Sequence, residues 1–155
     1  RRLVQSPILT IDSDRVFTES AFGLRVADDV ETQSAEISAE NRLIEADLKA
    51  EERKLTDQRS KLSPDAFSGL ADAFDEKVQK TRASQAAKGR ALNELVEKER
   101  HVFLAAAGPV LEQMMREAGA AVILERRSVF VSANAIDITD EAIERLDASV
   151  GSGKN

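Results

Sequence analysis

A proline near the middle of this 155-residue chain separates two long segments of the same character. In residues 22–62 and again in residues 65–107, apolar residues recur with helical spacing, and charged side chains fill most positions between them. Pro64 suits the first turn of a helix, and Ser63 before it is a favourable N-terminal cap. Each segment would form about 60 Å of helix. Helices so long and polar cannot be buried in a compact domain, so we predict an antiparallel helical hairpin with its turn near residues 62–65, projecting from a smaller body.

The apolar residues of the hairpin follow the spacing of a coiled-coil seam in which many positions are polar. Gln33, Glu40 or Asn41, and Glu51 or Glu52 stand where further apolar residues are expected. Because so few apolar residues repeat per heptad, we expect the two helices to pack weakly against each other. The predicted seam consists of Val30, Ile37, Ile44, Leu48, Leu55 and Leu62 in the first helix and Phe67, Phe74, Val78, Gln85, Leu92 and Leu95 in the second.

The two ends of the chain carry short apolar runs that are typical of strands. We predict one strand at residues 8–11 and two more at residues 120–124 and 129–131, with residues 125–128 joining the last two as a hairpin that lacks the usual glycine. Thr139 is expected to cap a final helix.

These elements predict a β-rich oligomerisation body formed by residues 1–21 and 108–150, separated from the hairpin of residues 22–107 by a kink at Gly108-Pro109. Residues 151–155 are expected to form a disordered tail. The predicted fold class is α+β, mainly α.

Three short strands bury little surface and leave their edges unpaired. A sheet or barrel shared between copies of the chain would remove those edges, so we predict a closed oligomer. The residues expected at its interface are Ile8, Leu9, Ile11, Val122, Ile123, Leu124, Val129, Phe130 and Val131.

The composition excludes several classes of catalytic site. The chain has no cysteine, which excludes disulfides, thiol catalysis and cysteine-based metal sites. His101 is the only histidine, and no set of metal ligands surrounds it in the sequence. No glycine-rich phosphate loop is present, and carboxylate pairs such as Asp28-Asp29 lie on polar helix faces. We therefore predict a protein that is not an enzyme and that uses no cofactor or metal.

The segment after the first strand carries a resemblance to a known family. Residues 12–23 contain Arg-Val-Phe at 15–17, Glu-Ser at 19–20 and Gly23, in the order found at the start of the Skp/OmpH family of periplasmic chaperones of outer-membrane proteins. The end of the chain is similar too, with two apolar runs followed by Asp137-Ile138-Thr139 at the start of the last helix. The order of elements resembles the family over nearly the whole chain.

The resemblance implies a homotrimer shaped like a jellyfish, in which a β body joins the subunits and three helical tentacles enclose a cavity. Unfolded outer-membrane β-barrel proteins would be held there without ATP, so the implied function is that of a holdase that prevents their aggregation in the periplasm. The chain begins Arg-Arg-Leu-Val without an initiating Met, and we expect it to be a mature form from which a signal peptide has been removed. The alternative is a coiled-coil scaffold that docks one folded partner, although the irregular seam argues against it.

In one respect the chain departs from the better-known family members, which are strongly basic, because its net charge is −6. Residues 77–93 nevertheless contain five basic residues and no acidic one. A solvated helix face is the default interpretation of such a segment. Contact with acidic clients or with an anionic lipid surface is the second, and nucleic-acid binding is the third, because the net charge opposes it. The candidate contact residues are Lys77, Lys80, Arg82, Lys88 and Arg90.

Overall fold

The computed structural model describes residues 3–154, which fall into two compact units. Unit 1 contains the chain up to Asp29 and again from Val96 onward, and unit 2 consists of residues 30–95. These boundaries lie further into the hairpin than the predicted ones at residues 22 and 107. The reason is that Phe22 and Phe103, at the bases of the two long helices, are buried in the core of unit 1.

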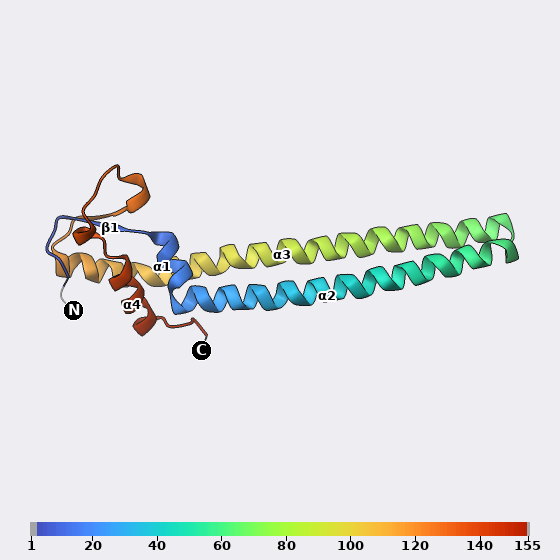
Figure 1. Ribbon diagram of the computed structural model, residues 1–155, viewed down its shortest axis with the longest axis horizontal. Helices are drawn as coiled ribbons and strands as arrows, with labels where there is room; N and C mark the ends of the chain where they lie inside the picture. The colour runs from blue at the N-terminus through green and yellow to red at the C-terminus, as the bar shows by residue number, and fades with distance from the viewer. Residues whose placement is uncertain (1–2, 155) are drawn as a thin grey trace. The chain divides into compact units, whose positions relative to one another are not determined.

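Unit 2 is the predicted helical hairpin. The helix α2 (Ala21–Gln58) ends in a 3₁₀ turn (η1, Arg59–Lys61), and the helix α3 (Pro64–Ala118) returns beside it in the antiparallel direction (Figure 1). Ser63 caps α3 as predicted, because its hydroxyl accepts a hydrogen bond from the amide of Ala66 at 3.2 Å. No helix in the described residues has the length and apolar content needed to span a membrane.

The sheet of unit 1 pairs the two ends of the chain. Strand β1 (Ile8–Ile11) lies parallel to β2 (Val122–Glu125), with Ile8 opposite Val122, and the backbone of Thr10 forms a further bridge with Asp137. Figure 1 shows β1 in the unit that also contains α1 (Ser13–Glu19) and α4 (Thr139–Ser149). A small sheet built from both chain ends agrees with the predicted fold class.

The predicted hairpin of strands 120–124 and 129–131 is wrong in this chain. Residues Arg126–Ser128 form a 3₁₀ turn (η2), and residues 129–131 pair with no strand in the described part of the chain. The connection lacks the Gly or Asn that a tight hairpin turn needs. Its two arginines are held instead by ion pairs, Arg126 with Asp137 at 3.3 Å and Arg127 with Asp14 at 2.8 Å.

The helix α3 does not end at Gly108-Pro109, where a kink between hairpin and body is predicted, but continues through Pro109 to Ala118. A proline removes one backbone donor from a helix but need not end it when the surrounding residues are packed. Here Ala107 before it and Met114 after it are both buried in unit 1.

The core of unit 1 is centred on three phenylalanine rings. Phe103 lies 5.2 Å, centroid to centroid, from both Phe17 and Phe22. The other fully buried large apolar side chains are Leu9, Met114 and Leu146, which come from β1, α3 and α4. This core therefore joins elements from the start, the middle and the end of the chain.

A small network of hydrogen bonds holds the start of α4 against β1. The Asp137 carboxylate accepts hydrogen bonds from the Thr139 amide and the Thr10 hydroxyl, both at 3.1 Å. The Thr139 hydroxyl accepts from the Asp12 amide at 2.9 Å, so it links α4 to the end of β1 rather than capping its own helix as predicted. Burial raises the pKa of Asp137, but these hydrogen bonds and the charge of Arg126 outweigh that effect and leave it below the usual value.

Residues 151–154, part of the predicted disordered tail, contact the base of α2. The Ser152 carbonyl accepts a hydrogen bond from Arg25 at 2.8 Å, and Lys154 lies 3.4 Å from Asp29. Gly153 has a φ of 77° and lies against the Phe22 ring, where a Cβ would be 2.4 Å from a ring carbon. Asn155, the last residue of the predicted tail, lies outside the described residues.

Gly23 is required where α2 begins. The Ser20 hydroxyl donates to the Phe17 carbonyl at 2.8 Å and accepts from the Gly23 amide at 3.2 Å, which brings the two backbones together. A Cβ on Gly23 would lie 1.6 Å from the Phe17 carbonyl oxygen.

Replacing Gly23 with Ala is therefore expected to destabilise unit 1 by about 1–3 kcal/mol, because the start of α2 must move away from Phe17. The matched control is Gly89→Ala in the interior of α3, where a Cβ meets no atom within 4 Å. That change should stabilise the protein by about 0.5–1 kcal/mol. Urea unfolding followed by circular dichroism compares the two, and equal stability of both variants would contradict the close contact.

Candidate functional site

The predicted interface residues of unit 1 divide into a buried set and an exposed set. Leu9 and Ile11 are buried in the core, and Ile123 and Val129 are half-buried. The others form an exposed group that we call the apolar edge. It consists of Ile8, Val122, Leu124, Phe130 and Val131, of which Phe130 is fully exposed and Val131 is 78% exposed.

The seam of unit 2 lies where the heptad spacing predicts it. Each of the twelve predicted positions in α2 and α3 is buried or half-buried. Within residues 30–95, all of which the structure describes, Leu48 is nevertheless the only buried hydrophobic residue, and it is still 8% exposed. Leu43 is 69% exposed and Leu70 is 44% exposed. The hairpin is therefore joined by a thin apolar seam that leaves apolar surface in contact with solvent.

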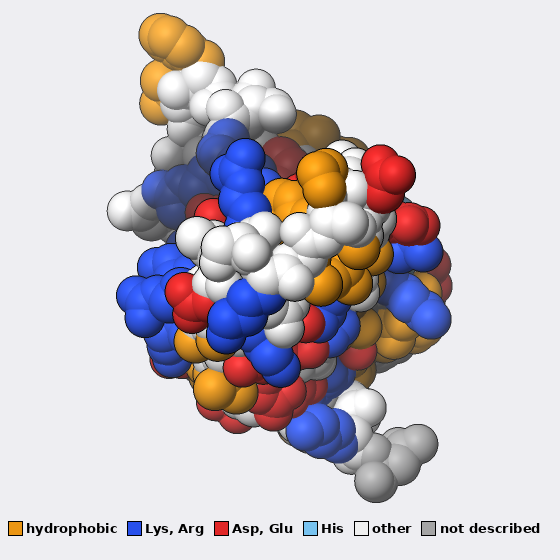
Figure 2. Space-filling view, turned by 90° about the vertical axis from the view of Figure 1, so that its right-hand side faces the viewer, with side chains coloured by type: hydrophobic (Ala, Val, Ile, Leu, Met, Phe, Trp, Pro, Cys, Tyr) orange, Lys and Arg blue, Asp and Glu red, His pale blue; other side chains and the backbone are white. Residues whose placement is uncertain are grey.

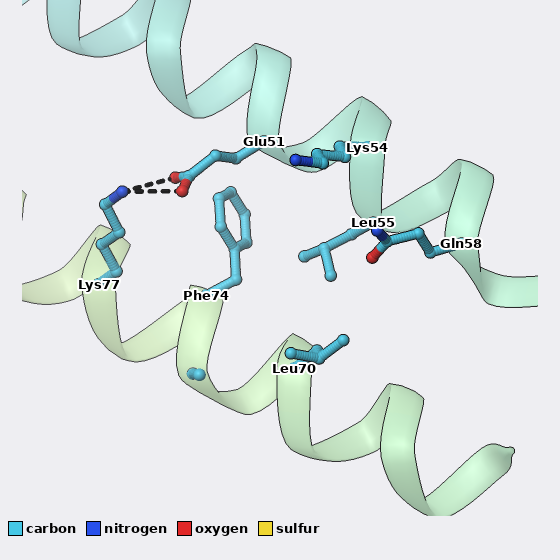
Figure 3. Close-up of a pocket in the computed structure, with 8 residues that line it drawn as sticks. Glu51, Lys54, Leu55, Gln58, Leu70, Phe74 and Lys77 are labelled. Carbon is cyan, nitrogen blue, oxygen red and sulfur yellow. Dashed lines mark hydrogen bonds and ion pairs between the residues drawn. The ribbon is translucent and has the colours of Figure 1, made fainter. Parts of the chain in front are cut away.

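Polar pairs across the hairpin occupy the positions where the seam lacks apolar residues. Lys77 lies 2.8 Å from both carboxylate oxygens of Glu51, as Figure 3 shows, and Lys88 lies 2.7 Å from Glu40. Gln85 donates a hydrogen bond of 2.7 Å to the side-chain oxygen of Asn41. The hydrogen bond from Lys88 lowers the pKa of Glu40. Because these groups are substantially exposed, each pair contributes little to stability and mainly fixes the register of the two helices.

These pairs change the interpretation of the five basic residues predicted as contacts. Lys77 and Lys88 are held by the pairs across the hairpin, and Lys80 lies 3.0 Å from Glu76 one turn away. Arg82 and Arg90 are exposed, and neither has an ion-pair partner among residues 3–154. Among the five predicted contact residues, Arg82 and Arg90 are therefore the two whose charge is not paired with an acidic side chain in the described part of the chain. Sequence spacing alone could not show this, since the pairing depends on the register of α2 against α3.

Near the turn of unit 2 the side chains leave a pocket of about 250 Å³ between α2 and α3. Leu55, Leu70 and Phe74 point into the space between the two helices (Figure 3). Lys and Arg side chains are mixed with acidic and apolar ones on the face seen in Figure 2. Sequence reasoning missed this pocket, because it placed Leu55 and Phe74 in the seam and assigned no role to Leu70.

The described residues contain no group of side chains arranged to bind a metal ion. His101 is exposed on α3, and residues 3–154 hold no cluster of three or more histidine or acidic side chains placed to bind an ion. The candidate functional surfaces are the apolar edge of unit 1 and the thin seam, exposed cations and pocket of unit 2.

Comparison with known proteins identifies the family. The model of the family described as outer membrane protein (OmpH-like) matches residues 7–146, a range that contains β1, the whole hairpin, β2 and most of α4. The chain belongs to the OmpH-like family. This confirms the resemblance seen at residues 12–23 and at the end of the chain, and members of this family are not enzymes.

The fold of this OmpH-like protein is shared with a solved structure. A crystal structure from Caulobacter crescentus, of a protein described as an OmpH-like outer membrane chaperone, superposes with a TM-score of 0.87. It is 19% identical in sequence, and the match covers 96% of this chain and 88% of that one. A comparison with curated protein sequences found no significant match.

Proposed function

We propose that this OmpH-like protein is an ATP-independent holdase chaperone that binds unfolded outer-membrane proteins in the periplasm and prevents their aggregation. The observation that carries the proposal is the thin seam of unit 2, where Leu48 is the only buried hydrophobic residue in residues 30–95 and side chains such as Leu43 stay exposed. The family assignment supports it, and so does the shared fold of the Caulobacter crescentus protein described as an outer membrane chaperone.

The arrangement suits a protein that holds an unfolded chain without consuming energy. A holdase that binds the unfolded state opposes aggregation by mass action alone. Scattered apolar side chains provide many weak contacts that clients of different sequence can share, and the charged residues between them keep the complex soluble. Two weakly packed helices can also adjust to clients of different size.

We further propose that three copies assemble through the apolar edge of unit 1. Phe130 and Val131 expose large apolar side chains, which a soluble protein normally covers. Residue Val129 is in an extended conformation, with φ −101° and ψ 126°, and it follows a two-stranded sheet that has an unpaired edge. Pairing of residues 129–131 with the sheet of a neighbouring copy would cover the apolar side chains and remove the edge together.

Light scattering after size-exclusion chromatography tests the proposal. The protein alone is expected to have the mass of a trimer, and dilution of a urea-denatured outer-membrane β-barrel protein into it should give a soluble complex of fixed stoichiometry. A trimer that lets the barrel protein aggregate would contradict the holdase function and favour a scaffold that docks a folded partner. A monomer would contradict the trimeric assembly.

The double variant Arg82→Glu with Arg90→Glu reverses the two basic charges of residues 77–93 that form no ion pair in the described part of the chain. We expect it to bind an acidic unfolded client about tenfold more weakly at low salt. The dependence of the affinity on salt should also become flatter, because fewer attractive charges remain to be screened. Fluorescence anisotropy of a labelled client between low and physiological salt measures both effects.

The control for these reversals is Lys98→Glu with Arg116→Glu, which changes the net charge equally but lies in unit 1. It should leave client affinity within about twofold of the unmodified protein, within the usual scatter of surface charge effects. An equal loss in both double variants would show that only the total charge matters and that the position of Arg82 and Arg90 does not.

A further inference from the structure

The pocket near the turn of unit 2 has an apolar lining that the hairpin itself does not cover. Its walls are Leu55 from α2 and Leu70, Ala73 and Phe74 from α3. Leu70 lines it and is still 44% exposed, while Leu55 and Phe74 are only half-buried. With the small side chain of Ala73 between two large ones, α2 and α3 leave room for an apolar group from outside.

The rim of this pocket is polar, and only some of its side chains form ion pairs or hydrogen bonds. Lys77 and Glu51 neutralise each other at 2.8 Å on one side (Figure 3). Lys54 is exposed and forms no ion pair within residues 3–154, and Gln58 forms no side-chain hydrogen bond within the same residues. The rim therefore carries the unpaired positive charge of Lys54 and the unbonded side-chain amide of Gln58, both beside an apolar hollow, as far as residues 3–154 show.

From this geometry we propose that the pocket binds a large apolar side chain whose neighbour in the client sequence carries a carboxylate. The apolar side chain enters between Leu55, Leu70 and Phe74, and the carboxylate lies at Lys54, where charge complementarity selects it. The inference rests on the proposed holdase function and names the kind of client segment that this site takes: unfolded, acidic and interrupted by aromatic or large aliphatic residues.

A second pocket in the same hairpin provides an internal comparison. It has a volume of about 410 Å³ and is lined by Ile37, Leu92 and Leu95, but its rim carries Glu36 beside the ion pair of Glu40 with Lys88. The added charge at that rim is negative, so an acidic segment should be disfavoured there. The preference for acidic segments is thus assigned to the pocket near the turn and not to hairpin pockets in general.

The absence of Trp and Tyr from the chain makes the proposal directly measurable. The probe is a blocked five-residue peptide with Trp at its centre and Asp or Glu on both sides, so all Trp emission comes from the peptide. On titration with the full chain, its emission is expected to shift to shorter wavelength and its anisotropy to rise. A peptide with Lys in place of the acidic residues should bind at least fivefold more weakly.

Two variants locate the binding. Lys54→Glu should weaken the acidic peptide at least tenfold and strengthen the lysine peptide, and Ala73→Leu should abolish the emission shift of both by filling the hollow. Lys98→Glu, with the same change of net charge on unit 1, should leave both affinities unchanged. Circular dichroism verifies that each variant keeps its helical content. Leu70→Gln, which removes an apolar wall without adding volume, is a third pocket variant and should also weaken the acidic peptide.

The results separate this inference from the function on which it rests. If the unmodified protein keeps a denatured barrel protein soluble but the acidic peptide shows no shift, or binds the Lys54 and Ala73 variants equally well, the pocket proposal is overturned and the holdase function stands. If the peptide binds as expected while the barrel protein aggregates, the holdase function fails and the pocket remains a peptide site.

Discussion

Replacement of Phe103 by Ala is expected to lower the free energy of unfolding of unit 1 by about 3–5 kcal/mol. The Phe103 side chain is 1% exposed and contacts both Phe17 and Phe22 with ring centroids 5.2 Å apart. Truncation would leave a cavity where the three rings now meet, and it would also remove favourable tilted and edge-to-face contacts. Loss of this size is a large part of the stability of an ordinary domain.

Hydrogen exchange followed by mass spectrometry measures this loss separately in each unit. Exchange should accelerate in β1, α1 and α4, whereas α2 and α3 within residues 30–95 should change less. The matched control is Phe67→Ala in unit 2, where the ring is half-buried and lies 5.4 Å from the Arg59 guanidinium. That variant should lose about 1 kcal/mol or less. Equal acceleration of unit 1 in both variants would contradict the central role of Phe103.

Phe130→Asp is expected to convert the proposed trimer into monomers while the helical content is retained. In an assembled protein the side chain of residue 130 would be covered by a neighbouring copy, and an unpaired carboxylate there is costly to bury. In the single chain Phe130 is fully exposed, so the substitution removes no contact within the fold. Light scattering should report the mass of one chain in place of three, with the circular dichroism of helices unchanged.

Leu24→Asp is the control for this change, because Leu24 is 59% exposed in α2 and lies outside the apolar edge. It should leave the mass unchanged. A Phe130→Asp protein that stays assembled would remove residue 130 from the interface and direct attention to Ile8, Val122 and Leu124. Dissociation by both variants to the same extent would mean that neither position is specific.

The hairpin could be predicted because its signal is local. The periodic spacing of residues such as Ile37, Ile44 and Phe74 places them on one face of a helix whatever lies elsewhere in the chain. Pro64 and Ser63 likewise mark the start of a helix through their own backbone and side-chain chemistry. The burial of the seam residues, the start of α3 at Pro64 and the hydrogen bond to the Ser63 hydroxyl confirm these predictions.

The pairing of the strands could not be predicted in the same way. Apolar runs at residues 120–124 and 129–131 are equally good strands by composition, and their closeness in sequence favours a hairpin. The structure instead pairs Val122 with Ile8. This pairing depends on how the two chain ends pack together, which the sequence of residues 120–124 or 129–131 alone does not show. The ion pairs of Lys77 and Lys88 escaped prediction for the same reason, since they depend on which residues of two distant helices meet.

The pairing of β1 with β2 also sets the order in which the protein can form. Ile8 meets Val122 across more than a hundred residues, so β1 leaves the ribosome long before its partner exists. The hairpin between them, whose contacts are closer in sequence, can assemble first and bring the two strands together. Because the entropy of closing a loop grows only with the logarithm of its length, about 0.6 kcal/mol per doubling, helical turns can be added to or removed from both limbs together at little cost to the sheet. The length of the hairpin can therefore change without much effect on the stability of the sheet.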